Sequence, residues 1–143
     1  MTDTFKDYIT KTKSIINKTA FVNMKVLCER RQIPQLNFEC HFLFLDSDTF
    51  AQAITRKVDN ELKRAIQFNL HYIKEKEHRN LFLSEIVPHE VCHLVQHHLE
   101  FKNGFKHQGH GKLWYSLMKQ VGYTFPRETI SLEKLNDLRK IKS

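Results

Sequence analysis

Residues 81–99 carry the strongest pattern in this sequence. If the segment is helical, with about 100° of rotation per residue, its apolar side chains gather on one arc. These are Val87, Val91, Cys92, Leu94, Val95 and Leu99. His89, Glu90 and His93 fall on the opposite arc. The segment therefore predicts a helix from Leu81 to Leu99 that packs against a core on one side and lines a cleft on the other.

The spacing of His89 and His93 suits the binding of one metal ion. Residues four apart on a helix share one face about one turn apart, so both imidazoles can reach the same ion. Glu90 completes a His-Glu-x-x-His run and can contact a metal-bound water rather than the ion. We expect His89 and His93 to be metal ligands and Glu90 to be the general base of a hydrolytic reaction.

A catalytic zinc takes three protein ligands and leaves the fourth position to water. The further candidates are His97, His98, Glu100, His107 and His110. His97 lies about 12 Å along the helix axis from His89, which is too far for one tetrahedral shell. Glu100 lies on the same rigid axis, and His98 points into the apolar arc. His110 lies between two glycines after the Asn103-Gly104 break, and we favour it over His107 as the third ligand.

The remaining pattern predicts an α+β fold. We expect a helix over 3–30, a strand over 36–45 that is apolar on both faces like a central strand, a connection over 71–80, and helices over about 110–121 and 128–141. Asp59-Asn60 can turn a hairpin between Phe50–Val58 and Glu61–Asn69, with a helix as the alternative there. The sheet should have about three strands and be mostly antiparallel, in one domain over residues 1–143.

Two segments of this sequence resemble, in the same order along the chain, two motifs of the SprT/Spartan family of zinc metallopeptidases. They are Ile86-Val87-Pro88-His89-Glu90-Val91-Cys92-His93-Leu94 and His110-Gly111-Lys112-Leu113-Trp114. Upstream, Ile66-Gln67-Phe68-Asn69 resembles the strand that precedes the active-site helix in that family. The resemblance implies a zincin-like fold and one Zn²⁺ held by His89, His93 and His110, with Glu90 as the general base.

The resemblance also implies an activity. The eukaryotic branch of the family cleaves proteins crosslinked to DNA, so we expect an endopeptidase that hydrolyses protein substrates with a zinc-activated water and acts on DNA-associated proteins. We expect the substrate to add a strand at a sheet edge near Arg64–Asn69. Bacterial members often end in a four-cysteine zinc ribbon, which this sequence lacks, so we do not expect a ribbon to contact nucleic acid.

Charge and cysteine usage limit the partners. Residues 1–35 carry seven basic and three acidic side chains, and residues 101–143 carry nine and three, so both ends can attract DNA. Cys28, Cys40 and Cys92 form no Cys-x-x-Cys pair, which excludes a disulfide framework and predicts three buried thiols. The longest apolar run, Phe42–Leu45, is too short to span a bilayer. We expect a cytoplasmic monomer with no membrane partner.

Two other functions remain open from the residues alone. The first is a non-catalytic nucleic-acid-binding module with a structural zinc, which the basic ends favour and Glu90 disfavours. The second is a zinc hydrolase of a small substrate. Tyr115, Tyr123 and His107 are candidates for stabilising an oxyanion, and Trp114 is expected to anchor the packing of its helix.

Overall fold

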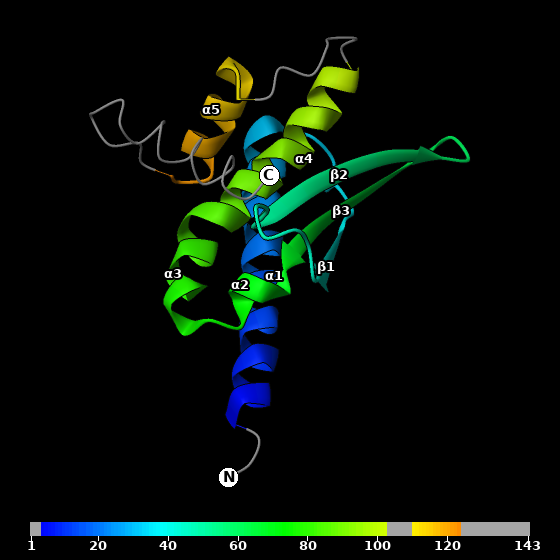
Figure 1. Cartoon of the computed structure of the whole chain (residues 1–143). Helices are drawn as coiled ribbons and strands as arrows, with labels where there is room; N and C mark the ends of the chain where they lie inside the picture. The colour runs from blue at the N-terminus through cyan, green and yellow to red at the C-terminus, as the bar shows by residue number, and fades with distance from the viewer. Residues whose placement is uncertain (1–3, 103–109, 124–143) are drawn as a thin grey trace.

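The computed structural model describes residues 4–102 and 110–123, which form an α+β fold with a three-stranded mixed sheet (Figure 1). Its elements, in chain order, are α1 (Thr4–Arg31), β1 (Glu39–Leu43), β2 (Ala51–Val58), β3 (Glu61–Asn69), α2 (Leu70–Ile73), η1 (Lys76–His78), α3 (Arg79–Leu81), η2 (Phe82–Ile86), α4 (Val87–Lys102) and α5 (Lys112–Gln120). The predicted loop after Lys102 and the predicted helix over 128–141 lie outside the described residues. No helix in the described part of the chain is both long and apolar enough to cross a membrane.

The sheet has the strand order β1-β3-β2. β2 and β3 pair antiparallel, whereas β1 pairs parallel with β3, so the sheet is mixed rather than mostly antiparallel. β1 is an edge strand, so the expectation of a central strand there was wrong. The apolar run misled because Leu36 and Phe38 are buried before the strand begins, while Phe44 beyond its end is 65% exposed.

The hairpin expected at Asp59-Asn60 is confirmed, and the helical alternative is wrong. Val58 pairs with Glu61, which leaves a two-residue loop. Asp59 and Asn60 have φ values of 51° and 68°, as a type I′ turn requires. Asp and Asn tolerate this left-handed conformation better than most residues, so the turn forms without glycine. In Figure 1 the tip of this hairpin extends away from the helices.

The core lies between the sheet and three helices. α1 packs against α4, and α4 also packs against α5, β2 and β3. α1 contributes a row of buried residues at helical spacing, and β3 contributes two alternate side chains: Ile16, Ala20, Met24 and Leu27, then Ile66 and Phe68. Residues 86–96 are buried without exception, because helices and sheet surround α4 from several sides.

The helix predicted over Leu81–Leu99 is confirmed and begins earlier, since α3, η2 and α4 follow one another from Arg79. η2 is a π-helical turn directly before α4. Pro88 has no amide hydrogen, and in a regular α-helix its ring would clash with the carbonyl of Ser84. The wider turn immediately before Pro88 is consistent with relief of that clash.

The polar segment over 71–80 forms short helical turns instead of an open connection. Lys76 and Arg79 place their cations 5.4 Å and 5.9 Å from the ring of Tyr8 on α1. Such cation–π contacts hold a charged segment against a helix without burying its charges. The segment therefore packs on α1 although it lacks an apolar pattern.

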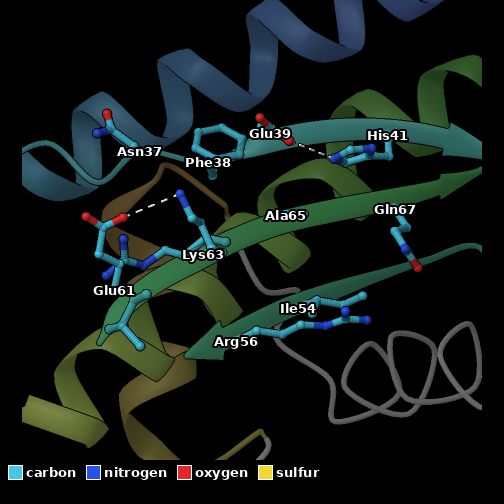
Figure 2. A pocket seen from close by; sticks show the side chains of 12 residues that line it. Asn37, Phe38, Glu39, His41, Ile54, Arg56, Glu61, Lys63, Ala65 and Gln67 are labelled. Atoms are coloured by element: carbon cyan, nitrogen blue, oxygen red, sulfur yellow. Dashed lines mark hydrogen bonds and ion pairs between the residues drawn. The ribbon is translucent and has the colours of Figure 1, made fainter. Parts of the chain in front are cut away.

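The outer face of the sheet carries a hollow of about 750 Å³ (Figure 2). It lies over Ala65, whose small side chain points away from the core that Ile66 and Phe68 enter. In its polar walls, Glu39 contacts His41 at 3.0 Å, and Glu61 forms an ion pair with Lys63 at 3.5 Å. None of the residues predicted to bind metal or to act as the general base lines this hollow.

Candidate metal centre

α4 places the three residues of its predicted motif in the interior. His89, Glu90 and His93 are 4%, 5% and 2% exposed. The rings of His89 and His93 are 4.9 Å apart between centroids, as expected for neighbours one helical turn apart. The helix therefore presents both imidazoles to the same point, in a site screened from solvent.

His110 comes from a distant part of the chain, directly before α5, and completes this cluster. Its Nε2 lies 3.1 Å from Nε2 of His89 and 3.1 Å from Nε2 of His93. A tetrahedral zinc with Zn–N distances of about 2.0–2.1 Å separates its nitrogen ligands by about 3.3 Å. Among the described residues, His89, His93 and His110 form a group that could hold a metal ion. Three convergent imidazole nitrogens suit zinc chemically.

Glu90 lies beside this group and outside it. Its Oε2 is 3.8 Å from Nε2 of His89, and the group of possible ligand atoms does not include it. A carboxylate at that position can reach a molecule bound next to the histidines. The carboxylate is buried and lies against the imidazole of His89.

Trp114 covers the histidine cluster from α5. Its ring centroid is 4.9 Å from His89, 5.8 Å from His93 and 4.4 Å from His110, and its Nε1–H donates to the His89 carbonyl at 3.4 Å. The indole is 1% exposed. It anchors α5 as predicted, and it also packs against every histidine of the cluster, which sequence reasoning missed.

The other ligand candidates that the structure describes are not part of the three-histidine group. Nδ1 of His97 shares a hydrogen bond of 2.8 Å with Oγ1 of Thr55 on β2. His98 does not enter the apolar arc as expected; it is half-buried, and Nδ1 accepts a hydrogen bond of 3.2 Å from Arg64. Glu100 is buried and not part of the group, and His107 lies outside the described residues.

The two tyrosine candidates occupy different surroundings. Tyr115 packs its ring against Trp114 at 5.0 Å. Tyr123 follows Gly122, whose φ of 99° reverses the chain after α5, and its hydroxyl hydrogen-bonds to Glu85. Burial raises the pKa of Tyr123, and the charge of Glu85 raises it further. Tyr123 therefore stays a neutral phenol that joins the end of α5 to η2.

The cysteines are not ligands of this centre. All three are free; Cys28 and Cys92 are buried as predicted, whereas Cys40 is half-buried. Burial raises the pKa of Cys92 well above its usual value, and the charge of neighbouring Glu90 adds to this. Burial raises the pKa of Cys40 to about 12. Cys92 therefore contributes packing volume inside the motif.

One contact at the centre was not expected from the sequence. Gln96 is fully buried, and its Oε1 lies 2.9 Å from Nδ1 of His93. A polar residue three positions after a ligand on the same helix face is the signal that could have revealed it. Its role could not be read from its residue type, because glutamine is neither a usual zinc ligand nor a group that transfers protons.

Fold and site together define an α+β protein in which two buried histidines of a His-Glu-x-x-His helix form a group with the half-buried His110. The model of the SprT-like family matches residues 19–134, which is most of the chain. The chain therefore belongs to the SprT-like family. No curated protein and no solved structure matches it.

Proposed function

We propose that this chain is a single-domain zinc endopeptidase over residues 1–143 that acts as a monomer. Family membership and the convergence of three Nε2 atoms beside a buried carboxylate support this proposal. His89, His93 and His110 would hold the ion. A bound zinc supplies Lewis acidity toward water and toward the carbonyl oxygen of a peptide bond.

The protein's own groups would perform the remaining steps. Glu90 accepts a proton from the attacking water and later returns it to the departing amine. Trp114 packs against the histidines and keeps bulk water from their far side. Tyr115 and Tyr123 are the described candidates for contact with the oxyanion, although Tyr123 is already bonded to Glu85.

The edge of the sheet that would bind an extended substrate is β2. The expected position near Arg64–Asn69 is wrong, because β3 pairs with β1 on one side and β2 on the other. Among the described residues, β2 pairs on one side only. It packs against α4, and the hydrogen bond between Thr55 and His97 joins it to the helix one turn beyond His93. A substrate strand added to β2 would therefore run close to the histidines.

Basic residues on α1 support an association with DNA. Residues seven apart on a helix lie about 20° apart around its axis, so they form one row. Such a row is formed by three exposed lysines, Lys11, Lys18 and Lys25, here named the lysine row. Lys134, Arg139 and Lys140, the basic residues expected to contact DNA from the predicted helix over 128–141, lie outside the described part. Contacts to phosphates without base recognition would bring the peptidase to proteins already on DNA.

The alternative proposal, a non-catalytic nucleic-acid-binding module with a structural zinc, rests on this same row. It leaves the buried carboxylate of Glu90 without a purpose, and a structural site usually has a fourth protein ligand. No fourth ligand joins the three histidines among the described residues. We therefore prefer the peptidase.

One experiment tests the proposed function. Purified protein is analysed for metal and then incubated with an unfolded general protein substrate, with and without DNA. We expect one zinc per chain and cleavage that a chelator abolishes and added zinc restores. Tightly bound zinc without cleavage under any condition would favour the binding module, and absence of zinc would contradict both proposals.

A further inference from the structure

Gln96 occupies a position where an apolar residue would be expected. It lies on α4 between Val95 and His97 and is 0% exposed. Burial of an amide costs free energy unless the amide is hydrogen-bonded. The bond between Oε1 of Gln96 and Nδ1 of His93, 2.9 Å long and inside the core, offsets part of that cost. An amide that is buried in the core and bonded to a histidine of the cluster indicates a function for Gln96 at that histidine.

The hydrogen bond determines which nitrogen of His93 carries the proton. A neutral imidazole has one N–H, and its other nitrogen has a free lone pair. The amide oxygen of Gln96 can only accept, so Nδ1 of His93 must donate. Nε2 is then unprotonated, and it is Nε2 that lies 3.1 Å from Nε2 of His110. This tautomer is the one that can bind a metal at the centre.

The same contact also fixes the orientation of the ring. His93 is held along its ring plane by Gln96, while the ring of His97 stacks beside it at 6.2 Å. A hydrogen bond on the outer nitrogen of a ligating histidine sets its tautomer and orientation and raises its basicity. Gln96 lies three residues from His93 on a rigid helix, so the two side chains meet without any loop rearrangement.

We propose that Gln96 is a positioning residue that prepares His93 for metal binding by holding its proton on Nδ1. This inference rests on the proposed zinc site. Gln96 touches neither metal nor substrate in this account and acts only through His93. Its loss should weaken metal binding, and a residue that accepts the same hydrogen bond should restore it.

Three variants test the proposal. Gln96→Met keeps an unbranched side chain of similar volume and helix propensity but removes the acceptor. Gln96→Glu keeps an acceptor. His98→Leu is the matched control, since it removes another hydrogen bond from α4, the one with Arg64, away from the cluster. Zinc affinity is measured by competition with a chromophoric chelator, and stability of the zinc-free proteins by denaturant unfolding.

We expect Gln96→Met to bind zinc about 10–100-fold more weakly than the wild type, as found for outer partners of ligating histidines. Gln96→Glu should bind at least as tightly as the wild type, and His98→Leu should bind equally tightly even if it unfolds more easily. Imidazole ¹⁵N spectra of the zinc-free protein should show His93 protonated on Nδ1 in the wild type and lose this preference in Gln96→Met.

Equal zinc affinity in Gln96→Met and the wild type would overturn the proposal. So would a loss of affinity that Gln96→Glu does not restore, because that result would assign Gln96 a packing role only. If the wild type bound no zinc, the three-histidine site itself would be wrong, so failure of the site and failure of the Gln96 proposal give different results.

Discussion

Replacement of His110 by alanine should remove most of the thermal stabilisation that zinc gives the protein. Two proposed ligands lie on α4, whereas His110 lies directly before α5. A metal held by all three joins these two parts of the chain in the folded state only. Metal binding is then part of the free energy of folding.

The size of the effect follows from this linkage. Zinc at about 1,000 times its Kd stabilises the folded state by about 4.1 kcal/mol. An unfolding entropy of about 2.1 cal/mol/K per residue gives about 0.3 kcal/mol/K for a chain of 143 residues. The wild-type Tm should therefore rise by about 14 °C. If loss of one ligand weakens zinc binding by about 100-fold, the remaining stabilisation is about 1.4 kcal/mol, or about 5 °C.

The assay is calorimetric unfolding of wild type, His110→Ala and His107→Ala, each freed of metal and then titrated with the same zinc concentrations. His107→Ala is the control and should retain the full zinc-dependent shift. A full shift in His110→Ala, together with its loss in His107→Ala, would refute the ligand assignment and the geometric reasoning behind it.

Three further predictions concern other parts of the molecule. The thiols should react with a disulfide reagent at pH 8 only after unfolding. Because the pKa of Cys40 is about 12, its thiolate fraction at this pH is about 10³-fold below that of a free cysteine. Rapid reaction of the native protein would contradict this prediction. Asn69→Asp should lower the free energy of unfolding, measured by chemical denaturation, by several kcal/mol. The buried side-chain amide of Asn69 donates hydrogen bonds to the carbonyls of Asp46 and Thr49, and a carboxylate cannot donate them. A change below about 1 kcal/mol would be inconsistent with these contacts. Replacement of the lysine row by glutamates should weaken DNA binding at low salt. The slope of log affinity against log salt concentration should become shallower by about 0.9 for each phosphate contact that is lost. Unchanged binding in a fluorescence titration would show that α1 does not contact DNA.

The local parts of this structure are predictable from the sequence because they depend on neighbours along the chain. The four-residue spacing of His89 and His93 places both on one helix face. Asp59-Asn60 suffices for a two-residue turn because both residues tolerate positive φ. The helix axis excluded His97 and Glu100 as further ligands, and the glycines on both sides of His110 favoured it over His107.

The parts that depend on distant contacts were not predictable in the same way. The position of β1 at the edge depends on its parallel pairing with β3, which no local pattern encodes. The turns over 71–80 depend on the ring of Tyr8, more than sixty residues earlier. The roles of Gln96 and Trp114 emerged only when their contacts with the histidines were known.

The most direct test of a hydrolytic centre is a comparison of wild type with Glu90→Gln, both loaded with zinc to the same measured content. Glutamine keeps the shape of the side chain and removes its ability to accept a proton from water. We predict equal zinc content, similar unfolding curves and a rate of peptide-bond cleavage lower by about 10²–10⁴-fold in Glu90→Gln. Equal cleavage rates in the two proteins would contradict the assignment of Glu90 and show that any observed proteolysis arises elsewhere.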